Sequence, residues 1–417
     1  MNDTMHNAPG RCRFCGTPLS RTFIDLGMSP LCQTHIEPDR LNAMERFYPL
    51  HAYVCETCYL VQLEEFASPD EIFSEYAYYS SFAESWLRHV EHYAGAMVAR
   101  LGLGPASLVT EVASNDGYLL QYFRKRGIPV LGVEPAANVA RAAEERGIRT
   151  VVEFLGEETA REIAAEHGRA DLLVGNNVLA HVPDLNDFVR GLGILLKPGG
   201  VLTMEFPHLL SLIELNQFDT IYHEHFSYFS LTTAASVFRA HGLVLHDVEK
   251  LPTHGGSLRI YVRHATDAAT TPSPALTSLL EEEEAWGVRD VRTYARYAGK
   301  VMETKRAILK FLLDAKAEGK QIVGYGAPGK GNTLLNYCGI RTDFLSYTVD
   351  RNPYKQGKYT PGTHIPIFPP ERIRETKPDY LFILPWNLKE EILEQNAFIR
   401  NWGGKFVVPI PAVQVIA

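Results

Sequence analysis

The chain has 417 residues, of which 46% are hydrophobic and 22% charged, and its formal net charge is −8; this length exceeds what one compact core usually supports, so we expect several domains. Acidic and basic residues are mixed with no basic stripe, which argues against a nucleic-acid polymer as a partner. The first ten residues are polar and no apolar run reaches membrane-spanning length, so we expect a cytoplasmic protein with no membrane partner.

Two pairs of cysteines with CxxC spacing lie near the N-terminus, Cys12 with Cys15 and Cys55 with Cys58. Each such turn directs two thiolates at a common centre, and two turns together can surround one tetrahedral zinc ion. Because four thiolates leave no open coordination position, we expect a structural zinc in a small domain over residues 1–70, with short strands such as 47–54. Buried thiols without a metal are the alternative.

The middle of the chain shows the rhythm of an α/β domain. Residues 82–101 carry apolar side chains at helical spacing. Beyond them, short apolar runs alternate with helical patterns, which predicts a parallel, doubly wound sheet within residues 71–270. The expected strands are residues 108–112, 130–133, 150–152, 172–175 and 201–206, with a Lys-Pro-Gly-Gly turn at 197–200 before the last.

The first of these strands leads into residues 111–117, where methyltransferases that use S-adenosylmethionine (SAM) carry a glycine-rich loop, although Ala113 and Asn115 replace two of the glycines. The next strand ends at Glu134, where a carboxylate can accept both ribose hydroxyls; a solvated loop carboxylate is the alternative. SAM is favoured over a dinucleotide because this unit has no phosphate cradle. The predicted cofactor residues are Glu111, Ala113, Ser114, Asn115, Gly117, Glu134 and Asn177.

Residues 219–228 concentrate side chains capable of proton chemistry, including Tyr222, Glu224 and His225. Carbon methylation needs a base beside a carbonyl and a donor for the resulting oxyanion, and histidine and tyrosine suit these tasks. We therefore predict a catalytic site here, with His181 and Tyr76 as further cleft residues. A metal site is disfavoured because the HExxH spacing that puts two histidines on one helix face is missing, and a structural histidine-rich turn is the remaining alternative.

A charged helical segment, residues 271–317, is expected to bridge two lobes, and a second Rossmann-like unit follows to residue 417. Residues 324–329 fit GxGxxG after the predicted strand 322–324, and Asp350 ends the next strand, 345–349. This pattern admits a rival function, an NAD-dependent sugar-nucleotide oxidoreductase. A Walker A loop is incomplete, because Gly331 stands where Ser or Thr would bind magnesium.

The same glycine loop can hold a pyrophosphate instead, because a helix N-terminus and Lys330 both attract anions. The helix is expected to start near Asn332. Asn332 is a further candidate for substrate binding. So are Arg351, Lys355 and Tyr359, which follow the next strand and have solvated loop residues as their alternative. A non-catalytic zinc scaffold would leave two cofactor-like crevices unexplained.

Taken together, the paired cysteines, the 111–117 loop, the Asn-Asn-Val-Leu-Ala-His strip at 176–181, the Tyr-His-Glu-His-Phe-Ser segment at 222–227 and the C-terminal glycine loop resemble a known family. The chain is similar over essentially its whole length to the SAM-dependent sugar C-3 methyltransferases of antibiotic deoxysugar biosynthesis, most of all to the branch that builds tetronitrose. The resemblance implies an α/β enzyme with a zinc domain, a central class I SAM methyltransferase domain, and a C-terminal Rossmann-like domain, 271–417 with its helical bridge, that contacts the sugar nucleotide.

The resemblance also implies a substrate and residue roles. The substrate would be a dTDP-linked 4-keto-6-deoxy sugar, with dTDP-3-amino-2,3,6-trideoxy-4-keto-D-glucose as first choice and the 3-hydroxy analogue dTDP-4-keto-2,6-dideoxy-D-glucose as the alternative. His225 would remove the C-3 proton, Tyr222 would face the sugar oxyanion and Glu224 would orient the histidine, while His181 and Tyr76 line the pocket. The oligomeric state stays open, with a monomer among the options.

Overall fold

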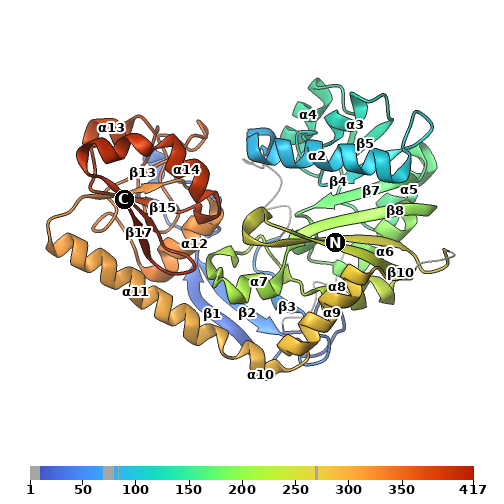
Figure 1. Cartoon of the computed structure of the whole chain (residues 1–417), viewed down its shortest axis with the longest axis horizontal. Helices are drawn as coiled ribbons and strands as arrows, with labels where there is room; N and C mark the ends of the chain where they lie inside the picture. The colour runs from blue at the N-terminus through green and yellow to red at the C-terminus, as the bar shows by residue number, and fades with distance from the viewer. Residues whose placement is uncertain (1–9, 69–78, 83, 268–270) are drawn as a thin grey trace.

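The computed structural model describes residues 10–68, 79–82, 84–267 and 271–417, and they form three β-sheets with flanking helices (Figure 1). The strands are β1 (Arg21–Ser29), β2 (Tyr48–Val54), β3 (Val61–Leu63), β4 (Val109–Val112), β5 (Val130–Val133), β6 (Thr150–Val151), β7 (Ala170–Asn176), β8 (Leu196–Pro207), β9 (Ser227–Tyr228), β10 (Leu243–Leu251), β11 (Ser257–His264), β12 (Ile322–Tyr325), β13 (Thr348–Val349), β14 (Ile367–Phe368), β15 (Tyr380–Ile383), β16 (Lys405–Val408) and β17 (Gln414–Ile416).

The helices lie on the faces of these sheets and between them. The α-helices are α2 (Glu84–Leu101), α3 (Leu120–Arg124), α4 (Ala137–Glu145), α5 (Glu157–His167), α6 (Leu185–Leu195), α7 (Leu209–Glu214), α8 (Leu231–Ala240), α9 (Pro274–Trp286), α10 (Val291–Tyr294), α11 (Tyr297–Ala317), α12 (Gly329–Cys338), α13 (Arg372–Thr376) and α14 (Lys389–Gln395). Within the described part of the chain, no helix combines the length and apolarity needed to cross a membrane.

The central sheet has the strand order β10-β11-β8-β7-β4-β5-β6. Its strands β4 to β8 run parallel, whereas β10 and β11 add an antiparallel edge. The predicted doubly wound sheet is therefore confirmed, and the antiparallel edge is an addition. The strand order reverses between β4 and β7, which makes the ends of these two strands the expected ligand crevice.

The Lys-Pro-Gly-Gly turn lies inside β8 rather than before it. Leu196 already pairs with Ala170, and a register shift follows before Val201 pairs with Leu172. Gly199 takes a left-handed φ of 78°, and a Cβ on Gly200 would meet the carbonyl oxygen of Lys197 at 2.8 Å. The turn residues thus form an irregularity within the strand, which the prediction of a simple helix-to-strand turn did not anticipate.

The C-terminal sheet has the order β14-β13-β12-β15-β16-β17, parallel except for β17. It reverses between β12 and β15, as a Rossmann-like unit does. The predicted bridge is confirmed as three helices, α9 to α11, and α11 runs along the lower edge of the C-terminal lobe in Figure 1. The helix after the glycine loop begins at Gly329, three residues before the predicted start at Asn332.

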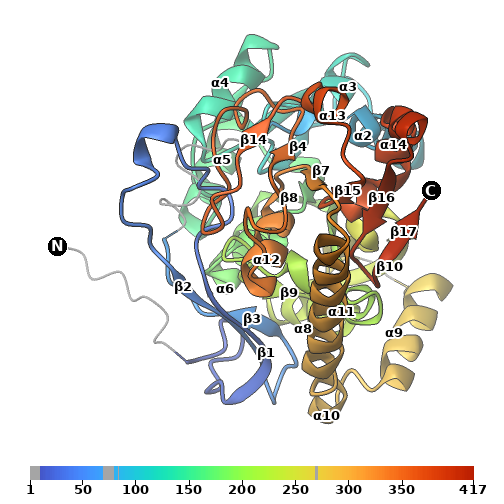
Figure 2. The ribbon, with the colours of Figure 1, turned by 90° about the vertical axis from the view of Figure 1, so that its left-hand side faces the viewer.

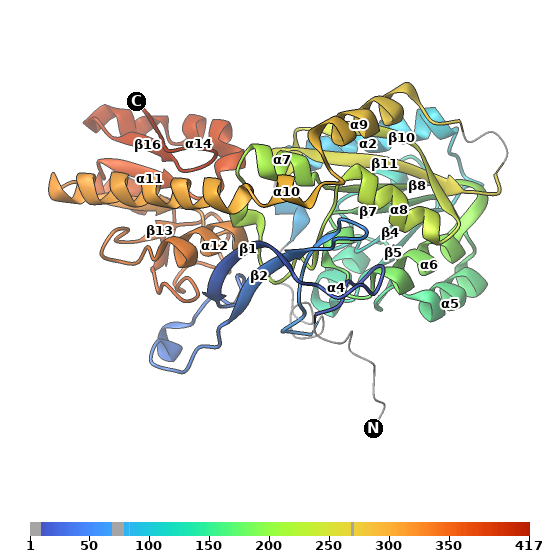
Figure 3. The same ribbon diagram turned by 90° about the horizontal axis from the view of Figure 1, so that it is seen from below.

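The N-terminal sheet, β1-β2-β3-β9, joins the two lobes. Its fourth strand, β9, comes from far along the chain: Tyr228 of β9 pairs with Val61 of β3. Phe23 of β1 stacks on Tyr297 of α11 with ring centroids 4.8 Å apart. In Figure 3, which views the molecule from below, β1 and β2 lie across the junction of the lobes. Figure 2 shows α12 beside α11.

Candidate functional site

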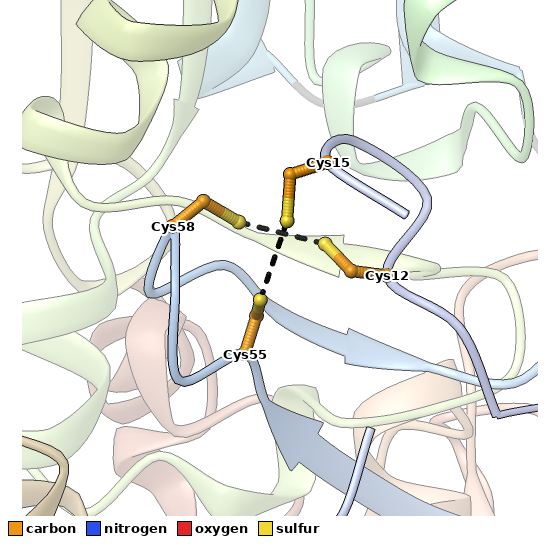
Figure 4. Close-up of side chains that lie close together, drawn as sticks. All are labelled: Cys12, Cys15, Cys55 and Cys58. Carbon is orange, nitrogen blue, oxygen red and sulfur yellow. Dashed lines mark hydrogen bonds between the residues drawn. The ribbon is translucent and has the colours of Figure 1, made fainter. Parts of the chain in front are cut away.

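The four paired cysteines meet in space and form the predicted zinc site (Figure 4). Their sulfur atoms lie within 4.8 Å of one another, which suits four thiolates around zinc at the usual Zn–S distance of about 2.3 Å. The amide of Gln62 donates to the sulfur of Cys12 at 3.1 Å, a contact that supports a thiolate. All four positions of a tetrahedral ion are taken, so the zinc is structural.

The zinc loop packs against the methyltransferase lobe. Arg13 donates to the carbonyl oxygen of Pro183 at 2.8 Å, and the amide of Asn186 donates to the carbonyl oxygens of Arg13 and Phe14 at 3.2 and 3.0 Å. Pro183 belongs to the wall of the main cavity. The zinc therefore fixes a loop that supports the rim of this cavity.

One large cavity of about 820 Å³ lies where the lobes meet. Ala113 and Asn177, which follow β4 and β7, line it, and so do Pro328 to Lys330, which follow β12. The carboxyl ends of two independent parallel sheets thus contribute to the same space. This is where ligands bind in such folds.

The predicted cofactor loop adopts left-handed backbone conformations typical of glycine, although two of the three residues concerned are not glycines. Ala113 and Asn115 have left-handed φ angles of 55° and 49°, and Gly117 has 75°. The side-chain oxygen of Asn115 accepts the backbone N–H of Ser80 at 2.9 Å, which holds the turn. The backbone shape that close approach to a cofactor requires is therefore kept.

Glu134 is held against this loop. Its two carboxylate oxygens accept the backbone N–H groups of Asn115 and Ala136, each at 2.9 Å, and the residue lines the cavity. Each oxygen keeps a lone pair for a ligand. By contrast, Glu111 and Ser114 are fully buried behind the loop and are not on the cavity wall, so they support the turn rather than face the cavity.

Four of the five predicted catalytic residues, His181, Tyr222, Glu224 and His225, line the cavity together. The ring of Tyr222 lies 4.1 Å from that of His225, and His181 meets His225 edge-on at 4.7 Å. Tyr76 lies outside the described residues. The cluster thus brings residues 44 positions apart in the sequence onto one wall.

The hydrogen bonds fix the protonation form of His225. Its Nδ1 lies 2.9 Å from the carbonyl oxygen of Thr220, which can only accept, so Nδ1 carries the hydrogen and Nε2 carries the lone pair. Burial, reinforced by the charges of His181, His254 and Lys330, holds the pKa of His225 well below its usual range. The ring is therefore neutral near pH 7 and can accept a proton at Nε2.

The expected pairing of Glu224 with His225 is wrong in its geometry. Cys32 donates from its sulfur to Oε1 of Glu224 at 3.3 Å, while the carbonyl of Thr220 orients the histidine. Cys32 belongs to the N-terminal domain, 192 positions before Glu224. The local sequence around Glu224 therefore could not indicate this contact. Burial raises the pKa of Glu224 to about 7, so its carboxyl group can carry a proton near neutral pH.

Of the predicted substrate residues, Lys330 alone lines the cavity. Its ammonium donates to the side chain of Asn387 at 2.9 Å and lies over the ring of Trp386, whose indole N–H in turn donates to Asp219 at 2.7 Å. Burial lowers the pKa of Lys330, and the charge of Asp219 opposes this effect. A half-buried cation at the start of α12 remains suited to an anionic ligand.

The other four candidates bind to the protein itself. The amide of Asn332 donates to the carbonyl of Cys32, and Lys355 donates to the carbonyl of Ala327 at 2.9 Å. The backbone of Tyr359 pairs with that of Ile36. The fourth, Arg351, is largely exposed and lies 3.6 Å from Glu391. These residues are not on the cavity wall.

The contacts of Asp350 argue against the interpretation of the C-terminal glycine loop as a dinucleotide site. Its carboxylate accepts the backbone N–H groups of Ala327 and Asn352 at 2.7 and 2.8 Å, and it does not line the cavity. The acid expected to hold a ribose is thus used to shape the glycine loop.

Among the cavity-wall residues that the sequence did not indicate are Trp86, Tyr118 and His254. Trp86 lies within residues 82–101, for which only an apolar helix face was predicted. His254 lies in a Thr-His-Gly-Gly turn, and the pair of glycines after a histidine was the available indication of a tight turn that displays it.

Comparison with known proteins identifies three family matches along the chain. Residues 12–73 match a zinc binding domain, residues 86–248 a methyltransferase domain, and residues 252–411 a C-methyltransferase C-terminal domain. None of these families is an oxidoreductase.

The chain is 38% identical to C-methyltransferase NovU of Streptomyces niveus over 407 residues. The matched region covers 97% of this chain and 96% of that protein. Ubiquinone biosynthesis O-methyltransferase of Escherichia coli O7:K1 is 36% identical over 97 residues, 22% of this chain and 39% of its own length. Among solved structures, magnesium protoporphyrin IX methyltransferase of Synechocystis PCC 6803 with bound SAH matches 42% of this chain and 83% of its own, with 17% identity and a TM-score of 0.35.

Proposed function

This chain belongs to the family of SAM-dependent C-methyltransferases, and we propose that it methylates C-3 of a dTDP-linked 4-keto-6-deoxy sugar. The preferred substrate is dTDP-3-amino-2,3,6-trideoxy-4-keto-D-glucose, and the 3-hydroxy analogue dTDP-4-keto-2,6-dideoxy-D-glucose is the alternative. We further propose that the enzyme acts in the cytoplasm, in a deoxysugar pathway.

One observation carries this proposal: a buried neutral histidine with its lone pair at Nε2 shares a cavity with the cofactor loop and the half-buried Lys330. Such a histidine is the group that carbon methylation needs and that oxygen or nitrogen methylation can often do without. A hydrogen on the carbon beside a carbonyl is acidic enough for it, because the charge left behind delocalises onto the carbonyl oxygen.

In the proposed reaction, Nε2 of His225 takes the C-3 proton, and the electrons of the C–H bond form the C-3 to C-4 double bond while C-4 oxygen becomes an oxyanion. The hydroxyl of Tyr222, beside the base, donates to this oxyanion. SAM, when bound, would supply an electrophilic methyl group and S-adenosylhomocysteine as the leaving group; C-3 would gain the methyl group as the C-4 carbonyl re-forms. Asn115 and Glu134 would hold the aminoacyl and ribose parts and align the methyl group.

Lys330 is the proposed partner of the nucleotide diphosphate, since it is the half-buried cation on the wall supplied by the C-terminal lobe. A dTDP-sugar brings a pyrophosphate, which a lysine at a helix N-terminus binds as a point charge. The peripheral candidates Arg351, Lys355 and Tyr359 would then act by shaping the surrounding loops.

The test is product analysis by mass spectrometry after incubation with SAM and each of the two dTDP-4-keto sugars. A gain of one methyl group at C-3 is expected, with faster turnover of the 3-amino sugar. No methylated product from either sugar would refute the substrate class, and methylation at nitrogen or oxygen would refute the mechanism.

The matched variant is His225→Asn, because an asparagine amide can still donate to the carbonyl of Thr220 but has no Nε2 lone pair. We expect it to stop both turnover and exchange of the C-3 proton with solvent deuterium while SAM binding stays. Undiminished exchange would remove His225 from the role of base.

A further inference from the structure

The turn between β10 and β11 is built around one histidine. His254 has a left-handed φ of 52°, and the two glycines after it have φ angles of 89° and 118°. A residue with a Cβ in this region is strained by about 1–2 kcal/mol. Such a conformation persists when the surroundings enforce it, and it is found most often at functional sites.

Neighbouring elements hold the turn from two sides. The hydroxyl of Thr253 donates to the buried carboxylate of Glu205 at 2.8 Å, and the amide of Gln217 donates to the carbonyl oxygen of Gly255 at 2.6 Å. The ring of Trp386, from the C-terminal lobe, lies so close that a Cβ on Gly255 would meet it at 2.6 Å. The turn is thus fixed between the central sheet and the C-terminal lobe.

The imidazole of His254 lines the main cavity. Its Nε2 lies 3.2 Å from the amide nitrogen of Asn177, another left-handed residue, with φ 54°, at the end of β7. Because an amide N–H can only donate, Nε2 accepts and Nδ1 carries the hydrogen. The side chain therefore presents a donor in a cavity where His225 presents an acceptor.

The surroundings keep this donor uncharged. Burial and the positive charge of Lys330 lower the pKa of His254 to about 4, against a smaller opposing effect of Glu205. A neutral imidazole that donates one hydrogen bond can stabilise an enolate oxygen without giving up its proton, as neutral histidine electrophiles do in other enzymes. Both His254 and His225 line the same cavity.

The stereochemistry of enolisation allows a further wall to supply a donor. The base removes the C-3 proton along the face of the forming double bond, and the methyl group also arrives along a face. The C-4 oxygen has two lone pairs in this plane; Tyr222, beside the base, is the proposed donor to one, and a donor from another wall can reach the second. His225 comes from the segment before β9 and the cofactor loop follows β4, whereas His254 comes from the β10–β11 turn.

Building on the proposed function, we propose that His254 is a catalytic residue that donates from Nδ1 to the C-4 oxygen of the keto sugar, as the second donor beside Tyr222. As His225 takes the C-3 proton and the C–H electrons move toward the C-4 oxygen, the hydrogen bond from His254 strengthens while its own proton stays on Nδ1. Asn177 is the positioning residue that keeps Nε2 occupied and so holds the donor tautomer.

Two substitutions distinguish the effect of the hydrogen-bond donor of His254 from the effect of its left-handed backbone. His254→Gly suits the left-handed conformation but removes the side chain, whereas His254→Asn also tolerates it and keeps an amide donor near the position of Nδ1. His246→Asn is the control, because this histidine lies on the same hairpin but outside the cavity.

We measure exchange of the C-3 proton with solvent deuterium, turnover with SAM, and the Kd for SAM by calorimetry. Loss of one oxyanion donor typically costs about 100- to 1,000-fold in rate. We therefore expect His254→Gly to slow both exchange and turnover by about 100-fold or more while the Kd for SAM changes less than about threefold, and His254→Asn to recover at least about tenfold. His246→Asn should match the wild type.

Exchange and turnover of His254→Gly within about threefold of wild type would overturn the role. A loss confined to SAM affinity would overturn it too, by assigning His254 to the cofactor. A merely structural role would leave the asparagine variant no better than the glycine variant. If the wild type methylates no 4-keto sugar, the proposed function fails together with this role; an active wild type with an undiminished glycine variant refutes His254 alone.

Discussion

The substitution Gly117→Ala tests how the cofactor loop keeps its shape. Gly117 has a φ of 75°, and a Cβ there would run into Cδ1 of Ile148. Ile148 is itself fully buried, so it has no free space to move into. The substitution therefore introduces two separate costs, one in the backbone and one in packing.

The left-handed backbone should cost about 1–2 kcal/mol and the overpacking about 1–3 kcal/mol, for a total of about 2–5 kcal/mol. Ile148→Val removes the clashing methyl group at a cost of about 0.5–1.5 kcal/mol when made alone. Added to Gly117→Ala, it should recover most of the packing cost but none of the backbone cost. The double variant should thus be more stable than the sum of the single effects predicts.

Urea unfolding followed by circular dichroism measures these free energies, and calorimetry measures the Kd for SAM. We expect weaker SAM binding in Gly117→Ala, because the loop must shift at Asn115, whose backbone N–H is bound to Glu134. A change in unfolding free energy below about 0.5 kcal/mol, or strict additivity with Ile148→Val, would refute this reasoning.

Three further outcomes are expected. Glu283→Ala should lower the unfolding free energy by about 3–5 kcal/mol, because this fully buried carboxylate accepts from His208 and from the backbone of Leu231 and Thr232; a urea-measured loss below about 1 kcal/mol would contradict this. The ratio kcat/KM should stay level as the pH falls through 6.5, the usual pKa of histidine, because the lowered pKa of His225 keeps it neutral there, and Lys330→Met should move the acidic fall to higher pH; a fall centred at or above 6.5 in the wild type would be inconsistent. Cys15→Ser should reduce zinc per chain, measured by mass spectrometry, and weaken SAM binding through the rim of the cavity; full metal content would argue against the four-cysteine site.

The elements with local causes were predictable from the sequence. The strands β4 to β8, β12 and β13 follow from short apolar runs between helical patterns, whereas β14, β15 and β16 were not predicted. The zinc site follows from the spacing of four cysteines. Glu134 could be placed because a strand end fixes the position of an acidic residue relative to the loop of the preceding strand.

Contacts between distant segments were not predictable in this way. The pairing of Glu224 with Cys32 spans 192 positions, and β9 joins β3 across a whole domain. Similarly, Lys330 could be proposed from its place at a helix start, but nothing local shows that it lines the same cavity as His225. Such partners depend on how complete lobes pack, and one sequence contains no record of that packing.

In the proposed mechanism, the position of residues 219–228 explains why the N-terminal sheet is needed in addition to the two lobes. The N-terminal sheet holds one side of it, since Leu63 donates to the carbonyl of Phe226 and His223 contacts the carbonyl of Pro49. The C-terminal lobe holds the other side, where Thr333 donates to the carbonyl of Ile221 at 3.1 Å.

The short segment between these contacts has little regular structure of its own, only the 3-10 turn at Phe218–Thr220 and the two residues of β9. A base on a free loop would lose the alignment that proton removal requires, because a displacement of about 1 Å can cost about 100-fold in rate. If His225 is the base, as proposed, the zinc domain and the C-terminal lobe contribute to catalysis by fixing the segment around Thr220, whose carbonyl sets the protonation form of His225.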